Sequence, residues 1–236
     1  MKYKIGLIGC GRISSKHLEG IINNKDKLTL VALADKNRTN LNERLVEFQN
    51  KLDTNSIKNK INCYSDYKEL LSKEKPDIVS ITTESGYHCE ITLDALDQGA
   101  NVLVEKPMAL SIQDAKEMIQ RASQKNKKLG VCFQNRFNLP VSRAYEALQS
   151  GRFGKIHHST VQIRWNRNDS YYNQAKWRGT WDLDGGTLMN QCTHGIDLLQ
   201  WFMGGKAKKI YGVLRRFLRP IEAEDFGSAI VEFENG

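Results

Sequence analysis

The sequence predicts an α/β fold with two domains: an N-terminal doubly wound parallel sheet and a C-terminal α+β domain on an open, mostly antiparallel sheet. Short apolar runs alternate with helical patterns over residues 1–130, which is typical of βαβ units. A glycine cluster follows the first of these runs. After Leu139-Pro140 the character changes, and a long run rich in β-branched and aromatic residues follows at 155–167. We therefore place the two domains at 1–130 and 131–236.

The N-terminal elements follow one another at short intervals. The apolar run 3–9 predicts a strand, and Ile13, Leu18 and Ile21 recur after it at helical spacing. A second apolar run, 28–34, ends at Asp35 and completes a βαβ unit. The further elements expected in this domain are helices around 41–48 and 91–96, a strand and helix pair at 64–71, and strands at 77–82, 102–104 and 129–134.

The C-terminal domain mixes helices with longer strands. The expected elements are a helix to about Ser150, a turn at 151–154, a strand at 155–167, a helix between Gly185-Gly186 and Gly204-Gly205, and strands at 208–217 and 227–234. The chain then ends in Asn235-Gly236, a strong hairpin signal with no returning strand. We therefore expect a truncated chain whose last sheet is incomplete.

Composition narrows the classes of partner. The 35 basic and 27 acidic residues leave a net charge of +8, which favours anionic partners. The basic residues are dispersed and form no nucleic-acid motif, and no apolar run approaches the ~20 residues of a membrane span. The five cysteines are scattered without a Cys-x-x-Cys pair, which favours a cytoplasmic protein without a zinc ribbon. We expect no metal site, because His157-His158 lies in a predicted strand that points the rings to opposite faces.

The glycine cluster is a dinucleotide-binding (Rossmann) fingerprint, Gly9-x-Gly11-x-x-Ser14, between the first strand and the first helix. Gly9 permits the tight turn, and Gly11 lets the backbone approach a pyrophosphate at the helix N-terminus. Asp35 follows the second strand, where an acid binds a ribose 2′-hydroxyl and favours NAD over NADP. Lys36 and Arg38 weaken this preference, because either could meet a 2′-phosphate.

Glu105-Lys106-Pro107 follows the predicted strand at 102–104, at the edge where ligands bind to doubly wound sheets. A partly desolvated Lys106 loses its proton more readily, so it can act in catalysis. Pro107 allows a cis bond or a fixed turn that aims this side chain. Taken alone, the tripeptide is a weak signal and is more often a surface ion pair.

These motifs resemble the glucose-fructose oxidoreductase, inositol dehydrogenase and rhizopine catabolism protein (Gfo/Idh/MocA) family, and the resemblance covers essentially the whole chain. Thr83 to His88, Gly99 to Pro107 and Gly185 to Asp197 contribute to it. It implies Lys106 and His194 as catalytic residues. It also implies a set of cofactor-binding residues: Gly9, Gly11, Arg12, Ile13, Asp35, Arg38, Thr83, Ser85, His88, Glu105, Lys106 and Gln134.

More narrowly, the segments 132–138, 151–156, 177–181 and 188–191 resemble the branch that oxidises UDP-N-acetylglucosaminuronic acid at its 3-hydroxyl in surface-polysaccharide biosynthesis. Asn190, His194 and Asp197 fall at i, i+4 and i+7, so we expect one helix face to present them toward the nicotinamide. Arg164, Tyr172 and Arg178 are of types that hold a diphosphate or carboxylate and stack on a uracil. The segment from Arg164 to Arg178 is equally consistent with an exposed sheet edge or a subunit contact. The substrate-binding set is thus Asn190, Arg164, Tyr172, Arg178 and Asp197.

We expect His194 to act as the base and Lys106 to stabilise the negative charge that develops on the hydroxyl oxygen, although the reverse roles stay open. Two alternatives remain for the function: a dehydrogenase of a free sugar or inositol, and a non-catalytic NAD(P)-sensing regulator. The resemblance also implies a homodimer or homotetramer that assembles through the C-terminal sheet.

Overall fold

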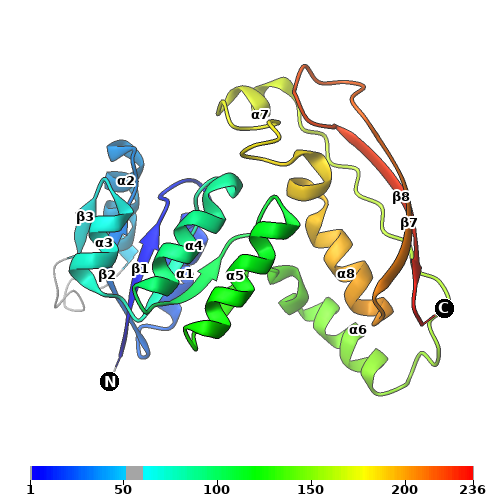
Figure 1. Cartoon of the computed structure of the whole chain (residues 1–236), viewed down its shortest axis with the longest axis horizontal. Helices are drawn as coiled ribbons and strands as arrows, with labels where there is room; N and C mark the ends of the chain where they lie inside the picture. Colours follow the sequence, from blue (N-terminus) through cyan, green and yellow to red (C-terminus); the bar gives the residue numbers. More distant parts are fainter. Residues whose placement is uncertain (1, 52–60, 236) are drawn as a thin grey trace. The chain divides into compact units, whose positions relative to one another are not determined.

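The computed structural model describes residues 2–51 and 61–235, and it divides the chain into two compact units, Met1–Cys132 and Phe133–Gly236. Unit 1 contains one parallel sheet in the order β3-β2-β1-β4-β5-β6. Figure 1 labels its first three strands, β1, β2 and β3. This arrangement confirms the predicted doubly wound fold. The strands are β1 (Tyr3–Ile8), β2 (Leu28–Ala34), β3 (Asn62–Tyr64), β4 (Ile78–Ile81), β5 (Asn101–Val104) and β6 (Leu129–Val131).

Helices cover both faces of this sheet. They are α1 (Ser14–Asn23), α2 (Arg38–Lys51), α3 (Tyr67–Glu74), α4 (His88–Asp97) and α5 (Ile112–Gln124). Leu7 and Ile8 are neighbours in β1 and therefore point to opposite faces, and each belongs to a different buried cluster. The cluster around Ile8 includes residues of α3, α4 and α5, while the cluster around Leu7 includes residues of α1 and α2.

The strand registers bring the carboxyl ends of the strands to one level. Ile8 pairs with both Ala34 and Ile81, Ile81 pairs with Val104, and Val104 pairs with Val131. The residues that follow these strand ends, which are Gly9, Asp35, Thr82, Glu105 and Cys132, therefore share one edge of the sheet. This is the edge at which doubly wound sheets bind ligands.

Unit 2 contains α6 (Leu139–Gln149), α7 (Asp169–Asn173), α8 (Thr193–Met203) and an antiparallel pair, β7 (Ala207–Arg215) with β8 (Phe226–Phe233). The helix before Ser150 and the two late strands agree with the sequence. No helix among the described residues is both long and apolar enough to cross a membrane. The predicted hairpin at Asn235-Gly236 lies partly outside the described residues, because Gly236 is not among them.

The expected strand at 155–167 is not a strand in the structure. Residues 155–167 make no backbone hydrogen bonds to other described residues. A β-rich composition becomes a strand only when a partner supplies the ladder, because β-propensity reflects packing against neighbouring strands. The strand expected at 129–134 is also shorter than predicted, because a 3-10 turn occupies Gln134–Phe137.

The expected helix after Gly185-Gly186 is interrupted. A π-helical turn spans Thr187–Gln191, in which the Cys192 N–H donates to Thr187 O at 2.9 Å, and α8 begins only at Thr193. Gly186 has φ +80°, and a Cβ there would lie 2.0 Å from Glu224 Oε2. The expected single helix from Asn190 to Asp197 is therefore wrong, because Asn190 belongs to the π-helical turn and only His194 and Asp197 belong to α8.

Candidate functional site

The glycine loop after β1 has the geometry that a dinucleotide needs. Gly9 has φ +91°, and a Cβ there would lie 2.6 Å from the Thr82 carbonyl carbon, so the end of β4 excludes any side chain. A Cβ on Gly11 would meet nothing within 4 Å, which leaves open space above the loop. The loop leads into α1, whose first N–H groups attract anions. The residues present therefore fit the pyrophosphate of NAD.

Asp35 lies beside this loop at the end of β2. Its Oδ2 accepts the Cys10 N–H at 2.6 Å, and its Oδ1 accepts the Asn37 N–H at 2.6 Å. Each carboxylate oxygen can accept more than one hydrogen bond, so Asp35 retains capacity for a ribose hydroxyl. Arg38 is exposed at the start of α2, and Lys36 lies over the Tyr87 ring with its ammonium 5.0 Å from the ring centroid.

The turn after β4 contains three further residues of the predicted cofactor set. Ser85 is buried and Thr83 is half-buried. His88 is only 1% exposed, and its nitrogens contact Pro107 O at 2.8 Å and Thr83 O at 3.2 Å. Burial is the main cause that lowers the pKa of His88 below its ordinary value, and it outweighs these hydrogen bonds. His88 thus joins the turns after β4 and β5.

Glu105 and Lys106 follow β5 at the same edge of the sheet. Glu105 is 6% exposed; its Oε1 lies 2.9 Å from His17 Nε2, and its Oε2 accepts the Lys106 N–H at 3.1 Å. Burial by itself would raise the pKa of Glu105, but the hydrogen bond and charge of His17 outweigh it and hold this pKa below its ordinary value. Lys106 is half-buried and precedes a cis peptide bond to Pro107.

Sequence reasoning missed His17. The signal was available, because His17 follows Ser14 by one helical turn and precedes Ile21 by another, which places it toward the buried face of α1. With Glu105 and Cys132, it forms a group whose potential metal-ligand atoms all lie within 4.8 Å of one another. Burial, and then the nearby Glu105, raises the pKa of the Cys132 thiol to about 12. A protonated thiol is a poor metal ligand, so the absence of a metal stays our expectation.

In unit 2, His194 lies in the first turn of α8 and is 9% exposed. Its Nε2 lies 3.4 Å from the Gln134 amide nitrogen, and the Phe133 ring meets it edge-on. An amide nitrogen only donates, so in this orientation Nε2 is the unprotonated nitrogen. Gln134, predicted to bind the cofactor, is thus brought together with the predicted base.

The other two predicted residues of this region are held by charged neighbours. The Asn190 amide donates to the Asp184 carboxylate, which is 3% exposed and also accepts the Gly179 N–H at 2.7 Å. Arg136 binds Asp197 with two hydrogen bonds, one of them from Nε to Oδ2 at 2.7 Å. Sequence reasoning missed Asp184 and Arg136, although Arg136 lies inside the 132–138 motif.

Arg178 lies in a cluster of aromatic side chains. Its guanidinium carbon is 4.0 Å from the centroid of Tyr171 and 5.1 Å from that of Trp177, and its buried Nε has no hydrogen-bond partner among the described residues. The ring of Tyr172 meets Tyr171 edge-on, and burial is the main cause that raises the pKa of Tyr172. Arg164 is exposed and donates to Gln162, so it stays apart from these contacts.

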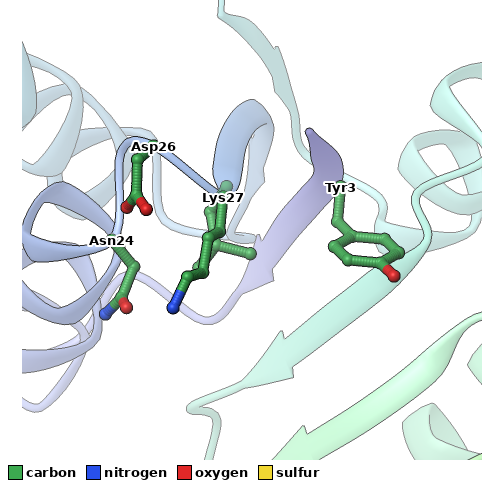
Figure 2. Close-up of a pocket in the computed structure, with 5 residues that line it drawn as sticks. Tyr3, Asn24, Asp26 and Lys27 are labelled. Carbon is green, nitrogen blue, oxygen red and sulfur yellow. The ribbon is translucent and has the colours of Figure 1, made fainter. Parts of the chain in front are cut away.

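A shallow pocket lies at the other end of the parallel sheet, where β1 and β2 begin (Figure 2). Tyr3, Asn24, Asp26 and Lys27 line it together with Leu28. None of them belongs to the predicted site. The pocket therefore lies at the edge of the sheet opposite to the predicted cofactor site.

Both halves of the chain match known protein families. Residues 3–133 match the family model described as "Oxidoreductase family, NAD-binding Rossmann fold", and residues 141–236 match the "GFO/IDH/MocA C-terminal domain". The structure of the WlbA dehydrogenase from Bordetella pertussis, in complex with NADH and UDP-GlcNAcA, is 33% identical with a TM-score of 0.91. It covers all of this chain, which spans 70% of that protein.

Two curated relatives are similar in sequence. The 1-carboxy-3-chloro-3,4-dihydroxycyclohexa-1,5-diene dehydrogenase of Comamonas testosteroni is 29% identical over 99% of this chain, which spans 55% of that protein. The D-glucoside 3-dehydrogenase of Escherichia coli is 30% identical over 67% of this chain, which spans 42% of that protein. The chain thus spans about half the length of these relatives. From the two matching family models, it belongs to the Gfo/Idh/MocA family of NAD-binding oxidoreductases.

Proposed function

We propose that this protein uses NAD to oxidise the 3-hydroxyl of UDP-N-acetylglucosaminuronic acid to the 3-keto sugar, a step of surface-polysaccharide biosynthesis. One observation carries the proposal: the WlbA dehydrogenase complexed with NADH and UDP-GlcNAcA matches the whole chain at 33% identity and a TM-score of 0.91. A second WlbA dehydrogenase, from Chromobacterium violaceum, matches at 32% identity with the same TM-score. The Rossmann loop and Asp35 support NAD as the cofactor.

Oxidation of the alcohol requires a base for the hydroxyl proton and a means of stabilising the oxygen as its charge grows. We assign His194 as the base, because a neutral imidazole nitrogen can accept a proton near neutral pH. We assign Lys106 to the developing charge on the oxygen. A bound NAD would supply the hydride acceptor for carbon 3. The overall reaction would convert the alcohol and NAD⁺ into the ketone, NADH and one proton.

We assign recognition of the anionic substrate to unit 2, in particular to Arg178. Its buried Nε lacks a hydrogen-bond partner among the described residues, and a buried donor without a partner is costly unless a ligand satisfies it. The adjacent Tyr171 and Tyr172 supply aromatic surface for a base. Asn190 and Asp197 belong to the same proposal, with their orientations set by Asp184 and Arg136.

The exposed apolar side chains of β7 and β8, among them Ile210 and Ile230, support a homodimer or homotetramer through this sheet. All five cysteines are free thiols, which supports a reducing, cytoplasmic environment. We propose both this assembly and this location. Size-exclusion chromatography with light scattering tests the first, and fractionation of the native host tests the second.

The proposed reaction is tested by following NADH formation after purified protein and NAD are mixed with UDP-N-acetylglucosaminuronic acid. UDP-N-acetylglucosamine, a free glucoside and myo-inositol serve as comparison substrates, and NADP replaces NAD in a parallel series. We expect NADH with the uronic acid alone. Turnover of the glucoside or myo-inositol instead would support the free-sugar alternative, which the D-glucoside 3-dehydrogenase similarity favours. Tight NAD binding without any turnover would support a regulator.

A further inference from the structure

A chain of buried hydrogen bonds connects α1 to the segment that carries Lys106. Ser80 Oγ lies 2.7 Å from His17 Nδ1, and His17 Nε2 lies 2.9 Å from Glu105 Oε1. Ser80 is 1% exposed, and the side chains of His17 and Glu105 are each 9% exposed. The chain thus joins β4, α1 and the end of β5, all within unit 1.

The hydrogen-bonding capacity of these groups identifies the donor in the contact between His17 and Glu105. A carboxylate only accepts, so His17 Nε2 carries a proton and donates to Glu105. Nδ1 accepts from the Ser80 hydroxyl when the imidazole is neutral and donates to Ser80 Oγ when it is protonated, so the contact forms in both states. The second carboxylate oxygen of Glu105 accepts the Lys106 N–H at 3.1 Å. Each side chain in this series of hydrogen bonds therefore has a fixed partner, and the last bond is made with the backbone N–H of Lys106.

The other side of Lys106 is held as well. The Pro107 carbonyl contacts Nδ1 of buried His88 at 2.8 Å. The backbone on both sides of Lys106 is thus fixed by a buried histidine, one acting through Glu105 and one directly. A buried carboxylate–imidazole pair is a poor device for stability, because removing both groups from water offsets most of their attraction. The geometry of this pair is better explained by the precision with which it holds the backbone of Lys106.

We propose that His17 is a positioning residue for Lys106: by holding Glu105 against Ser80, it fixes the Lys106 backbone and so the direction of its ammonium group. This inference rests on the proposed function, in which Lys106 stabilises the reacting oxygen. Small displacements of a catalytic group carry large rate penalties, and a misplacement of ~1 Å lowers rates about 100-fold. His17 itself has no contact with the reacting atoms in this proposal.

The variants that test it are His17→Leu, which removes both hydrogen bonds, and His17→Gln, whose amide can accept from Ser80 and donate to Glu105. Lys16→Ala is the matched control, because Lys16 is the preceding residue of α1 and its side chain is 74% exposed. We expect His17→Leu to lower kcat by about 10- to 100-fold with KM for the sugar changed less than about threefold. We expect His17→Gln to recover most of the loss. Equal losses in both variants would overturn the proposal.

A double-variant cycle with Glu105→Gln tests whether His17 acts through Glu105. If it does, the combined variant loses little more activity than the poorer single variant, because one shared interaction is removed twice. Losses that multiply would show two independent effects and overturn this route. Should His17→Leu fail to fold, Ser80→Ala removes only the hydroxyl at Nδ1, and we expect about a threefold loss of kcat with wild-type thermal stability. A Ser80→Ala variant with unchanged kcat would then overturn the proposal.

A second readout does not depend on turnover and so separates this inference from the proposed function. Trace acetic anhydride labels each lysine at a rate set by its protonation and surroundings, and mass spectrometry measures Lys106 against the exposed Lys25 in the same sample. We expect the relative labelling of Lys106 to change at least about threefold in His17→Leu and to return toward wild type in His17→Gln. If wild-type protein oxidises no sugar, the proposed function fails while this result still decides the positioning role. Unchanged labelling of Lys106 in folded His17→Leu overturns it.

Discussion

The two units hold their candidate functional residues in different ways. Unit 1 contains both buried apolar clusters, whereas the described part of unit 2 buries only Met203, Ile221, Ala223 and Phe233 among its apolar residues. Every residue of β7 is exposed, while the last four residues of β1 are buried. Unit 1 thus fixes Glu105 and His88 against a packed sheet. Unit 2 fixes Asp197 and Arg178 by ion pairing and ring contacts.

The precision with which side chains are held has a different physical origin in each unit. A packed core has few alternative arrangements, so side chains anchored to it keep one geometry. Cation–π contacts and half-exposed ion pairs contribute about 1 kcal/mol each and allow more adjustment. We therefore expect unit 1 to set the position of Lys106 rigidly and unit 2 to adapt its arginines and tyrosines to the ligand.

The largest expected effect lies in unit 2 and concerns chemistry. We expect His194→Asn to lower kcat by about 10²- to 10⁴-fold, because a positioned general base contributes that much. Steady-state kinetics of NADH formation measures it. The control is His157→Asn, since His157 is exposed and belongs to none of the candidate sites. A loss below about tenfold would transfer the role of base to Lys106 and unit 1.

The next prediction tests the difference in packing between unit 1 and unit 2. Leu33 of β2 is fully buried, whereas Ile230 of β8 is 74% exposed. We expect Leu33→Ala to lower the free energy of unfolding by about 3 kcal/mol, through lost burial and the cavity left behind, and Ile230→Ala by less than about 0.5 kcal/mol. Urea denaturation measures both. A large loss for Ile230→Ala would mean that an assembly covers β8 in solution.

The ion pair of unit 2 should contribute less than the core of unit 1. Arg136 and Asp197 have side chains 36% and 11% exposed, so solvent screens part of their attraction. We expect a coupling free energy of about 1 kcal/mol from a double-mutant cycle of Arg136→Leu and Asp197→Asn, measured by thermal unfolding. A coupling free energy near zero would mean that Arg136 orients Asp197 without stabilising the fold.

Acid should weaken unit 1 through Glu105. The pKa of Glu105 lies below its ordinary value of 4.5 in the folded protein, because His17 and the Lys106 N–H outweigh burial. The carboxylate therefore stabilises the folded state fully above that ordinary value, and this contribution disappears as the pH falls through the lower, folded-state pKa. We expect wild type to lose more stability than Glu105→Gln between about pH 6 and pH 3, measured by urea midpoints. Parallel losses would contradict the shift.

The smallest expected effect is that of metal removal. His17, Glu105 and Cys132 lie close enough to hold an ion, but their hydrogen bonds and the protonated thiol make one unnecessary. We expect dialysis against a chelator to leave NADH formation and thermal stability unchanged. A loss that zinc restores would turn this group of unit 1 into a metal site.

Much of unit 1 could be predicted from its sequence, because local patterns decide its elements. The Gly9 loop, the strand ending at Asp35 and the strand before Glu105 follow from periodicity and glycine spacing. The segment 155–167 could not be predicted in the same way, since its strand character depends on a partner far along the chain. The single helix expected through Asn190 and His194 was also wrong, because Asn190 lies in a π-helical turn that precedes α8.

The doubly wound sheet, the NAD fingerprint and the family resemblance all follow from the amino-acid sequence, because each depends on residue types at short, fixed spacings. The partners of the candidate residues become visible only in the folded protein: His17 with Glu105, Asp184 with Asn190, and Arg136 with Asp197. Of these, the first pair lies 88 residues apart in the chain and the last 61. Such contacts arise from strand register and helix packing, and no local pattern encodes them.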